Sequence, residues 1–270
     1  MLTGRKIVFI GGGNMAEAII LGLMREKAGA DISVAEINPE RREKISARFP
    51  TVRVVEDANE AAGWGELVIL AIKPQQASGV LDQLESVITP DKLVISIMAG
   101  IPTSKIEGNL VADCRVVRAM PNTAALVGAS ATAVSAGRKA STADLDLVRD
   151  IFAMIGFAVT VEEKQMDAVT ALSGSGPGYV FTFVEALSDA GVKNGLPRDV
   201  ASRLAVQTLL GSARMLLETG EHPAILKERV TSPGGSTSAG LHALENGSFR
   251  GAVMNAVDAA CRRSKELAGK

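Results

Sequence analysis

KIVFIGGGNMAEAIILGLMRE, residues 6–26, joins a short apolar strand, a glycine-rich turn and an amphipathic helix. The strand covers residues 7–10, whose β-branched and aromatic side chains favour extended structure. The helix carries apolar residues at the spacing of one helical face, namely Ile19, Ile20, Leu23 and Met24. A strand, a tight turn and a helix in this order predict the opening unit of a Rossmann-like α/β fold.

The turn itself has the composition that a dinucleotide-binding site requires. Gly11 permits a sharp turn, Gly13 lets the backbone approach a pyrophosphate, and Ala16 lets helix and strand pack closely. The first N–H groups of the helix have no partner within it and its dipole is positive at that end, so a diphosphate is a natural ligand. A glycine turn without a ligand is the alternative. The flanking strand and helix favour a cofactor site formed by Gly11, Gly12, Gly13, Asn14, Met15 and Ala16.

Strands and helices alternate through the N-terminal half of the chain. Strands are expected at residues 32–36, 52–55, 67–72, 93–98, 114–119, 130–134 and 157–161, and helices at 39–48, 75–87 and 143–155. Unbroken apolar strands suit a parallel sheet that is covered on both faces, and the strand at 130–134 is expected at the edge of that sheet. We predict a doubly wound, mostly parallel sheet in a dinucleotide-binding domain at residues 1–161.

Polar residues gather where three of these strands end. Such loops meet at the carboxyl edge of a parallel sheet, which is where ligands bind. Taken alone, Lys73-Pro74 favours an ordinary strand exit, because proline prevents the strand from continuing. Three strand ends that open onto one crevice favour a cofactor-binding site along it. The expected residues are Ala71, Ile72, Lys73, Pro74, Ala99, Gly100, Met120, Pro121 and Asn122.

Glu36 ends the second strand, 23 residues after Gly13. A carboxylate there would accept hydrogen bonds from the adenosine ribose and repel a 2′-phosphate, which favours NADH. Arg41 and Arg42 lie one turn into the following helix and, with Asn38, could reach a 2′-phosphate, although surface arginines are more often only solvated. The choice between NADH and NADPH therefore stays open.

Composition narrows the class of protein further. The 270 residues carry 29 Lys and Arg against 30 Asp and Glu, so no excess charge attracts nucleic acid or anionic lipid. We expect neither a nucleic-acid nor a membrane partner, and since no stretch resembles a signal peptide or a membrane span, we expect a cytoplasmic protein. Cys114 and Cys261 have no C-x-x-C partner and the two histidines form no ligand cluster, so we expect buried cysteines and no metal.

Beyond residue 161 the strand pattern stops and the sequence becomes helical. Helices are expected at residues 177–194, 197–219 and 251–268, all rich in Leu, Val and Ala. Helices this apolar are expected to bury more than the core of their own domain, and a second copy of the chain is the simplest partner. We predict an all-helical domain at residues 162–270 for substrate binding and dimerisation.

A second glycine-containing turn lies inside the helical domain. In Thr231-Ser232-Pro233-Gly234-Gly235-Ser236-Thr237, proline and paired glycines precede hydroxyl residues and a helical pattern. The backbone N–H groups of Gly235, Ser236 and Thr237 would form an anion pocket of the size of a carboxylate. The alternative, which the pattern taken alone favours, is an N-capped helix after a flexible turn.

Several segments together resemble 1-pyrroline-5-carboxylate reductase in order and spacing. They are residues 11–16, 71–75, 120–122, 171–179, 191–198 and 230–240. The similarity runs essentially from end to end, and the segment 231–240 with His222-Pro223 is specific to that family. It implies reduction of 1-pyrroline-5-carboxylate to L-proline, the last step of proline biosynthesis, by hydride transfer from NADPH or NADH. It also implies a homodimer or a ring of dimers such as a homodecamer.

The resemblance also implies roles for individual residues. Thr237 is expected to hydrogen-bond the ring nitrogen of the substrate, with Ser232 shaping the loop. The substrate residues are Gly234, Gly235, Ser236, Thr237, Met120, Pro121 and Asn122. The cofactor residues are Gly11, Gly12, Gly13, Asn14, Met15, Ala16, Glu36, Asn38, Asn59, Ala71, Ile72, Lys73, Pro74, Ala99 and Gly100. Glu36 departs from the family pattern, because many relatives carry a small or neutral residue there and use NADPH.

Two other functions remain open. Related hydroxyacid dehydrogenases of similar two-domain build carry a lysine acid a few residues past the glycines of a long helix, and here that place is Val180. A non-catalytic module that senses the redox state of a dinucleotide would keep residues 11–16 but would have no reason to keep 231–240. An assay of NADH or NADPH oxidation with 1-pyrroline-5-carboxylate discriminates between these functions.

Overall fold

The computed structural model describes residues 2–110 and 113–269, and the chain divides into two compact units. The first unit combines Met1–Ser175 with Ala260–Lys270, and the second is Gly176–Ala259. These units are defined by packing alone. The division into functional domains at residues 1–161 and 162–270 therefore stays a prediction.

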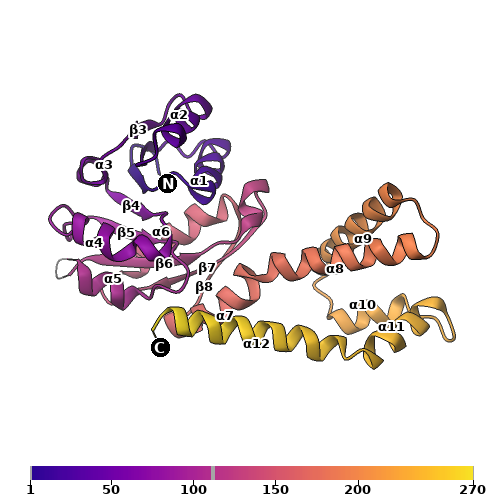
Figure 1. Ribbon diagram of the computed structural model, residues 1–270. Coiled ribbons are helices and arrows are strands. Elements are labelled where there is room, and N and C mark those ends of the chain that lie inside the picture. Colours follow the sequence, from indigo (N-terminus) through magenta and orange to yellow (C-terminus); the bar gives the residue numbers. More distant parts are fainter. Residues whose placement is uncertain (1, 111–112, 270) are drawn as a thin grey trace. The chain divides into compact units, whose positions relative to one another are not determined.

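The described part of the first unit is built on one sheet of eight strands in the order β3-β2-β1-β4-β5-β6-β7-β8 (Figure 1). The strands are β1 (Lys6–Ile10), β2 (Asp31–Ala35), β3 (Arg53–Val55), β4 (Leu67–Leu70), β5 (Leu93–Ser96), β6 (Arg115–Met120), β7 (Ser130–Ala136) and β8 (Gly156–Thr160). Neighbouring strands pair in parallel except β6 and β7, which are antiparallel. The predicted mostly parallel α/β sheet is confirmed.

Helices cover both faces of this sheet, as a doubly wound fold requires. They are α1 (Asn14–Arg25), α2 (Pro39–Arg48), α3 (Ala58–Trp64), α4 (Ala77–Leu84), α5 (Thr103–Asn109), α6 (Thr142–Ala153) and α7 (Met166–Val169). Short turns complete them: η1 (Pro74–Gln76), η2 (Thr123–Val127), η3 (Glu163–Gln165) and the π-helical η4 (Thr170–Gly174). The sequence pattern does not predict α3 and α5, because seven residues give barely two turns of periodicity.

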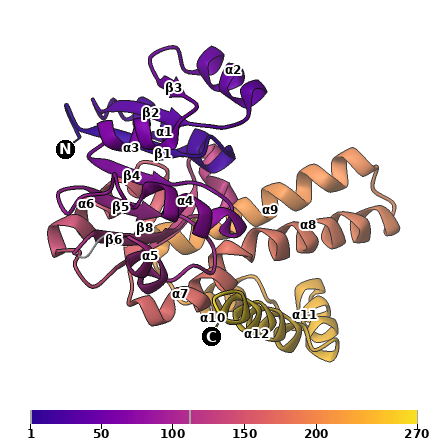
Figure 2. The same ribbon diagram turned by 60° about the vertical axis from the view of Figure 1, so that its left-hand side comes forward.

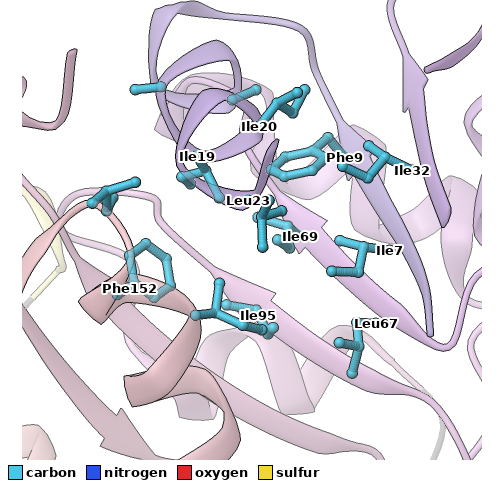
Figure 3. Packing of buried hydrophobic residues seen from close by; sticks show 14 of the residues in the cluster. Ile7, Phe9, Ile19, Ile20, Leu23, Ile32, Leu67, Ile69, Ile95 and Phe152 are labelled. Atoms are coloured by element: carbon cyan, nitrogen blue, oxygen red, sulfur yellow. The ribbon is translucent and has the colours of Figure 1, made fainter. Parts of the chain in front are cut away.

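Alternate residues of β1 face two separate hydrophobic clusters. Ile7 and Phe9 pack with residues of α1 and α6, including Ile19 and Phe152 (Figure 3). Val8 and the other alternate residues of the strand pack with α3, α4 and α5 on the opposite face. Burial on both faces explains why β1 is apolar throughout. The glycine turn follows directly at the carboxyl end of this strand.

The prediction that residues 130–134 form an edge strand is wrong. β7 lies between β6 and β8, and β8 is the edge strand. The small hydroxyl residues of β7 suggest exposure, but in the structure each has a partner. Ser130 and Thr132 share a hydrogen bond of 3.0 Å, and Ser135 donates to Glu163 at 2.5 Å. These bonds allow the hydroxyls to be buried while β7 pairs with β6 on one side and β8 on the other.

The second unit is all helical, as predicted. Its helices are α8 (Gly176–Lys193), α9 (Arg198–Thr219), α10 (Pro223–Arg229), α11 (Ser236–Asn246) and the start of α12 (Phe249–Leu267). α8 and α9 form an antiparallel pair (Figures 1 and 2). α10 was not predicted. No helix in the described part of the chain is both long and apolar enough to cross a membrane.

Large apolar side chains of the second unit remain exposed. They include Val180, Phe181, Phe183, Leu187, Leu204, Val206, Leu210, Met215 and Leu217. In α8 and α9 the described buried residues are small, namely Ser188, Ala201 and Ala205. A single copy of this unit therefore leaves uncovered an apolar surface of the kind that marks an interface.

Candidate active site

The glycine turn joins the end of β1 to the start of α1. Gly11 has φ +97°, and a Cβ there would lie 2.7 Å from the carbonyl oxygen of Ala71. Only glycine fits this position, because L side chains rarely adopt this φ and the end of β4 leaves no room. Gly13 is the N-cap of α1, and no side chain among the described residues caps the helix. The first N–H groups of α1 are therefore available to a ligand.

A cavity of about 330 Å³ opens beside this turn, at the carboxyl ends of β1, β2 and β4. It lies where the strand order reverses between β1 and β4, the usual ligand position in such sheets. Predicted cofactor residues from three segments line it: Gly11, Gly13, Glu36, Asn38, Ala71, Ile72 and Lys73. Residues that the sequence did not single out line it as well, among them Ile37, Glu56, Ala58, Gln76, Val80 and Gln83.

Gly13 leaves open space at the start of α1. A Cβ at Gly13 would approach only the carbonyl oxygen of Ala71, at 4.0 Å. Its φ of −72° is accessible to any residue. Neither packing nor backbone conformation therefore requires glycine here. The space without a side chain lies beside the free N–H groups of α1, where the pyrophosphate of a dinucleotide fits.

Glu36 is held at the rim of the cavity by two backbone N–H groups. Gly12 N donates to its Oε2 at 2.9 Å, and Asn38 N donates to its Oε1 at 2.9 Å. An ionised carboxylate has lone pairs left for further donors after these two bonds. The fixed carboxylate fits the hydroxyls of an adenosine ribose and opposes a phosphate in the same place.

The two arginines that follow are both tied to the protein. Arg41 donates from Nε to the carbonyl oxygen of Gly12 at 2.7 Å and pairs through Nη2 with Glu17 at 2.7 Å. Arg42 donates to two backbone carbonyl oxygens and pairs with Glu56 at 2.8 Å. Neither is a freely solvated surface arginine, and neither is free for a 2′-phosphate in this arrangement.

Several predicted cofactor residues do not line the cavity. These are Gly12, Asn14, Met15, Ala16, Asn59, Pro74, Ala99 and Gly100. Ala16 is fully buried in a hydrophobic cluster, which suits its expected packing role. The Oδ1 of Asn59 is buried without a hydrogen-bond partner among the described residues, so a ligand donor would satisfy it. Gly100 lies against the end of α12, where a Cβ would be 3.4 Å from Leu267 Cβ.

Met120-Pro121-Asn122 ends β6 and packs against the π-helical turn η4. A Cβ on Gly174 would lie 2.8 Å from Met120 Cε. Asn122 donates from Nδ2 to the carbonyl oxygen of Ser173 at 3.0 Å, and its Oδ1 accepts from Ala124 N at 3.2 Å. Because both ends of the amide are engaged, Asn122 fixes the exit of β6 next to the π-helical turn η4.

A buried arginine lies two residues before this segment and was not among the predicted site residues. Arg118 is fully buried and pairs with Glu163 at 3.0 Å. Its Nε and Nη2 have no hydrogen-bond partner among the described residues. The available signal was a charged residue inside an otherwise apolar strand, which can be buried only with a partner.

The second predicted site lies in the helical unit, before α11. Gly234 has φ +67°, and a Cβ on Gly235 would overlap the hydroxyl of Ser232, so this loop conformation requires both glycines. Gly235 N donates to the carbonyl oxygen of Ser232 at 3.0 Å. Because that bond closes the turn, the N–H of Gly235 is not available to a carboxylate as expected, whereas those of Ser236 and Thr237 remain.

The helix that follows this loop is not capped by a side chain of any described residue. The alternative of a side-chain-capped helix is therefore not observed. Thr237 is partly buried, and its hydroxyl has no hydrogen bond among the described residues. A helix N-terminus with free N–H groups and a free hydroxyl can bind an anion and one further polar atom.

Both cysteines are free thiols, with Cys114 buried and Cys261 partly buried. Burial raises the pKa of the Cys114 thiol, which keeps it protonated and unreactive. Among the described residues, no group of three or more His, Cys, Asp and Glu side chains could hold a metal ion.

Known proteins resemble the chain along its whole length. Residues 163–267 match the family model for pyrroline-5-carboxylate reductase dimerisation, and residues 6–100 match that for NADP oxidoreductase, coenzyme F420-dependent. The pyrroline-5-carboxylate reductase of Methanosarcina acetivorans is 44% identical over 273 residues, which covers 100% of both chains.

Solved structures give the same picture. A pyrroline-5-carboxylate reductase from Coxiella burnetii has a TM-score of 0.92 at 37% identity, over 98% of this chain and 99% of that one. A Plasmodium falciparum pyrroline carboxylate reductase with NADP bound has a TM-score of 0.89 at 34% identity, over 99% and 100%.

Proposed function

The chain belongs to the pyrroline-5-carboxylate reductase family, and from this membership we propose that it reduces 1-pyrroline-5-carboxylate to L-proline, the last step of proline biosynthesis. NADH or NADPH, when bound, supplies the hydride. The observation that carries the proposal is the cavity beside α1, where Gly13 leaves open a space that the protein itself does not need. The Plasmodium relative with NADP bound supports a dinucleotide as its ligand.

The first unit would hold the cofactor. Gly11, Gly13 and the first N–H groups of α1 would hold the pyrophosphate, because they combine a close backbone approach with unpaired donors. Glu36 would accept hydrogen bonds from the adenosine ribose. Lys73 lines the same cavity and adds a positive charge at its rim.

The helical unit would hold the substrate. The N–H groups of Ser236 and Thr237 would bind its carboxylate, and the Thr237 hydroxyl would hydrogen-bond the ring nitrogen, with Ser232 shaping the loop. An imine nitrogen is readily protonated, so reduction needs imine and hydride donor held in the right geometry more than it needs a strong acid. That requirement agrees with a site of backbone donors and hydroxyls.

Steady-state oxidation of NADH and NADPH by the full chain tests the proposal. We expect both cofactors to be oxidised only when 1-pyrroline-5-carboxylate is present, with one L-proline formed for each cofactor oxidised. A protein that binds NADH but does not turn over with the imine would be a sensing module, which contradicts the proposal.

The same kinetics test the role of Glu36. Like charges in contact near a protein surface repel by a few kcal/mol before screening, so we expect NADH to be used at least as well as NADPH. Glu36→Ser should shift the ratio of kcat/KM toward NADPH by about tenfold, which is about 1.4 kcal/mol. Glu40→Ser removes an exposed acid from the same region and serves as the matched control. A preference of the unmutated protein for NADPH above tenfold would show that Glu36 does not face the ribose.

Self-association is the second part of the proposal. The family model covering residues 163–267 describes dimerisation, and the apolar side chains exposed on α8 and α9 need a partner surface. We expect no monomer at micromolar concentration in sedimentation velocity. Phe181→Glu should release monomer, since it places a charge on a side chain that is 66% exposed in the single chain. An active monomer of the unmutated chain would overturn this prediction.

A ring of dimers such as a decamer, and a cytoplasmic location, belong to the same proposal. So does the lack of a nucleic-acid or membrane partner, which the formal net charge of −1 supports. Sedimentation equilibrium of the same samples would distinguish a dimer from a larger ring.

A further inference from the structure

Glu17 is a buried acid in the first turn of α1, and it holds arginines that come from α2. Its side chain is 12% exposed. Oε1 pairs with Arg41 Nη2 at 2.7 Å, and Oε2 pairs with Arg48 Nη1 at 2.5 Å. Its neighbours Ala16 and Ala18 are fully buried. A buried acid that lost these two arginines would be left without a charged partner, so the pairing with Arg41 belongs to the packing of α1 against α2.

This pairing decides where the guanidinium group of Arg41 lies. Besides Glu17, it donates to the carbonyl oxygen of Gly12 at 2.7 Å and to Asn14 Oδ1 at 3.0 Å. Gly12 N donates to Glu36, so both backbone polar groups of Gly12 are held by side chains that follow β2. Arg41 is therefore fixed against the glycine turn, with three acceptors around it.

Arg41 lies in α2, just after the end of the second strand, although it does not itself line the cavity. Two hydrogen bonds connect the backbone of Arg41 to the Glu36 carboxylate through Asn38. Arg41 N donates to Asn38 Oδ1 at 3.0 Å, and Asn38 N donates to Glu36 Oε1 at 2.9 Å. In dinucleotide-binding folds, an arginine near the end of the second strand accommodates the 2′-phosphate of NADP. Here Arg41 is present, but its guanidinium group is paired with Glu17, which lies on α1.

We propose that Glu17 is a specificity-determining residue for the cofactor. By holding Arg41 against the glycine turn, it withholds that cation from a 2′-phosphate and so disfavours NADPH relative to NADH. The inference rests on the proposed dinucleotide function. Glu17 acts through Arg41 without touching the cofactor, whereas Glu36 acts by direct repulsion at the ribose, so the two effects are separable.

Fluorescence titration of the full chain with NADH and with NADPH, without imine, tests the inference. Glu17→Gln keeps the shape of the side chain and removes its charge, which takes away the ion pair with Arg41 and weakens the hold on that arginine. We expect the dissociation constant for NADPH to fall at least fivefold relative to that for NADH. Adding Arg41→Gln to this variant should cancel the gain. An unchanged ratio of the two dissociation constants in Glu17→Gln would overturn the inference.

Two controls keep the result interpretable. Glu40→Gln removes the same charge from an exposed residue in the first turn of α2, and it should leave the ratio within about twofold, because solvent and salt screen an exposed charge. If Glu17→Gln fails to bind NADH, Glu17→Asp takes its place, since the shorter acid loosens the hold on Arg41 at constant charge. A ratio unchanged there as well would overturn the inference. Failure of the unmutated chain to bind either cofactor would instead refute the proposed function.

Discussion

Gly13→Val should leave the protein folded while weakening its binding of NADH at least hundredfold. A Cβ at this position approaches only the carbonyl oxygen of Ala71, at 4.0 Å, and the φ of −72° is ordinary. We therefore expect a cost of about 1 kcal/mol in the free energy of unfolding, from the poorer N-cap of α1. The same side chain fills the space that a pyrophosphate would occupy. A hundredfold loss corresponds to about 2.7 kcal/mol of binding free energy.

Gly11→Ala is the matched comparison, and here we expect the main effect on the free energy of unfolding. It adds a smaller side chain, but at a φ of +97° and with the Cβ 2.7 Å from the same carbonyl oxygen. Backbone strain of this kind costs about 1 to 3 kcal/mol, so here the free energy of unfolding should fall. Urea unfolding and NADH titration of both variants separate the two effects. Normal NADH binding by Gly13→Val would mean that the pyrophosphate lies elsewhere.

The strands and the longer helices of the first unit were predictable because local sequence patterns encode them. β4 was expected at residues 67–72 and is found at Leu67–Leu70. A continuous run of apolar residues is typical of a parallel strand that is buried on both faces. The edge position given to residues 130–134 failed for a physical reason. Strand composition does not show that a hydroxyl such as Ser135 meets Glu163, and only that contact makes its burial tolerable.

In the candidate site, too, features set by local sequence could be predicted, whereas contacts between distant residues could not. The glycine turn could be predicted because spacing alone specifies a turn and a helix start. The bond from Gly12 to Glu36 spans 24 residues, and that from Arg118 to Glu163 spans 45, so neither follows from a local pattern. The loop before α11 is an intermediate case. Its glycines predict a turn, but they do not show that Gly235 N closes it onto Ser232.

The hydroxyls of the loop and of the start of α11 differ in their hydrogen bonding. The hydroxyl of Thr231 donates to the carbonyl oxygen of Lys227 at 2.7 Å, and a Cβ on Gly235 would overlap that of Ser232, so both serve the shape of the loop. The hydroxyls of Thr237 and Ser238 have no hydrogen bond among the described residues although both side chains are partly buried, and the family resemblance assigns the ring nitrogen to Thr237. A partly buried hydroxyl is expected to be satisfied by a ligand or by water.

Thr237→Ala should therefore lower kcat/KM for the imine while leaving NADH affinity unchanged. A hydrogen bond to the reacting ring nitrogen is worth about 1.5 to 3 kcal/mol, which predicts a loss of roughly ten- to hundredfold. NADH affinity should not change, because the glycine turn belongs to the other compact unit. Thr237→Val keeps the volume of the side chain and should lose as much, which distinguishes a lost hydrogen bond from lost packing. Ser238→Ala removes the neighbouring hydroxyl and should retain full activity. Unchanged turnover of both Thr237 variants would remove this residue from the mechanism and leave the carboxylate site of α11 without a contact to the reacting atom.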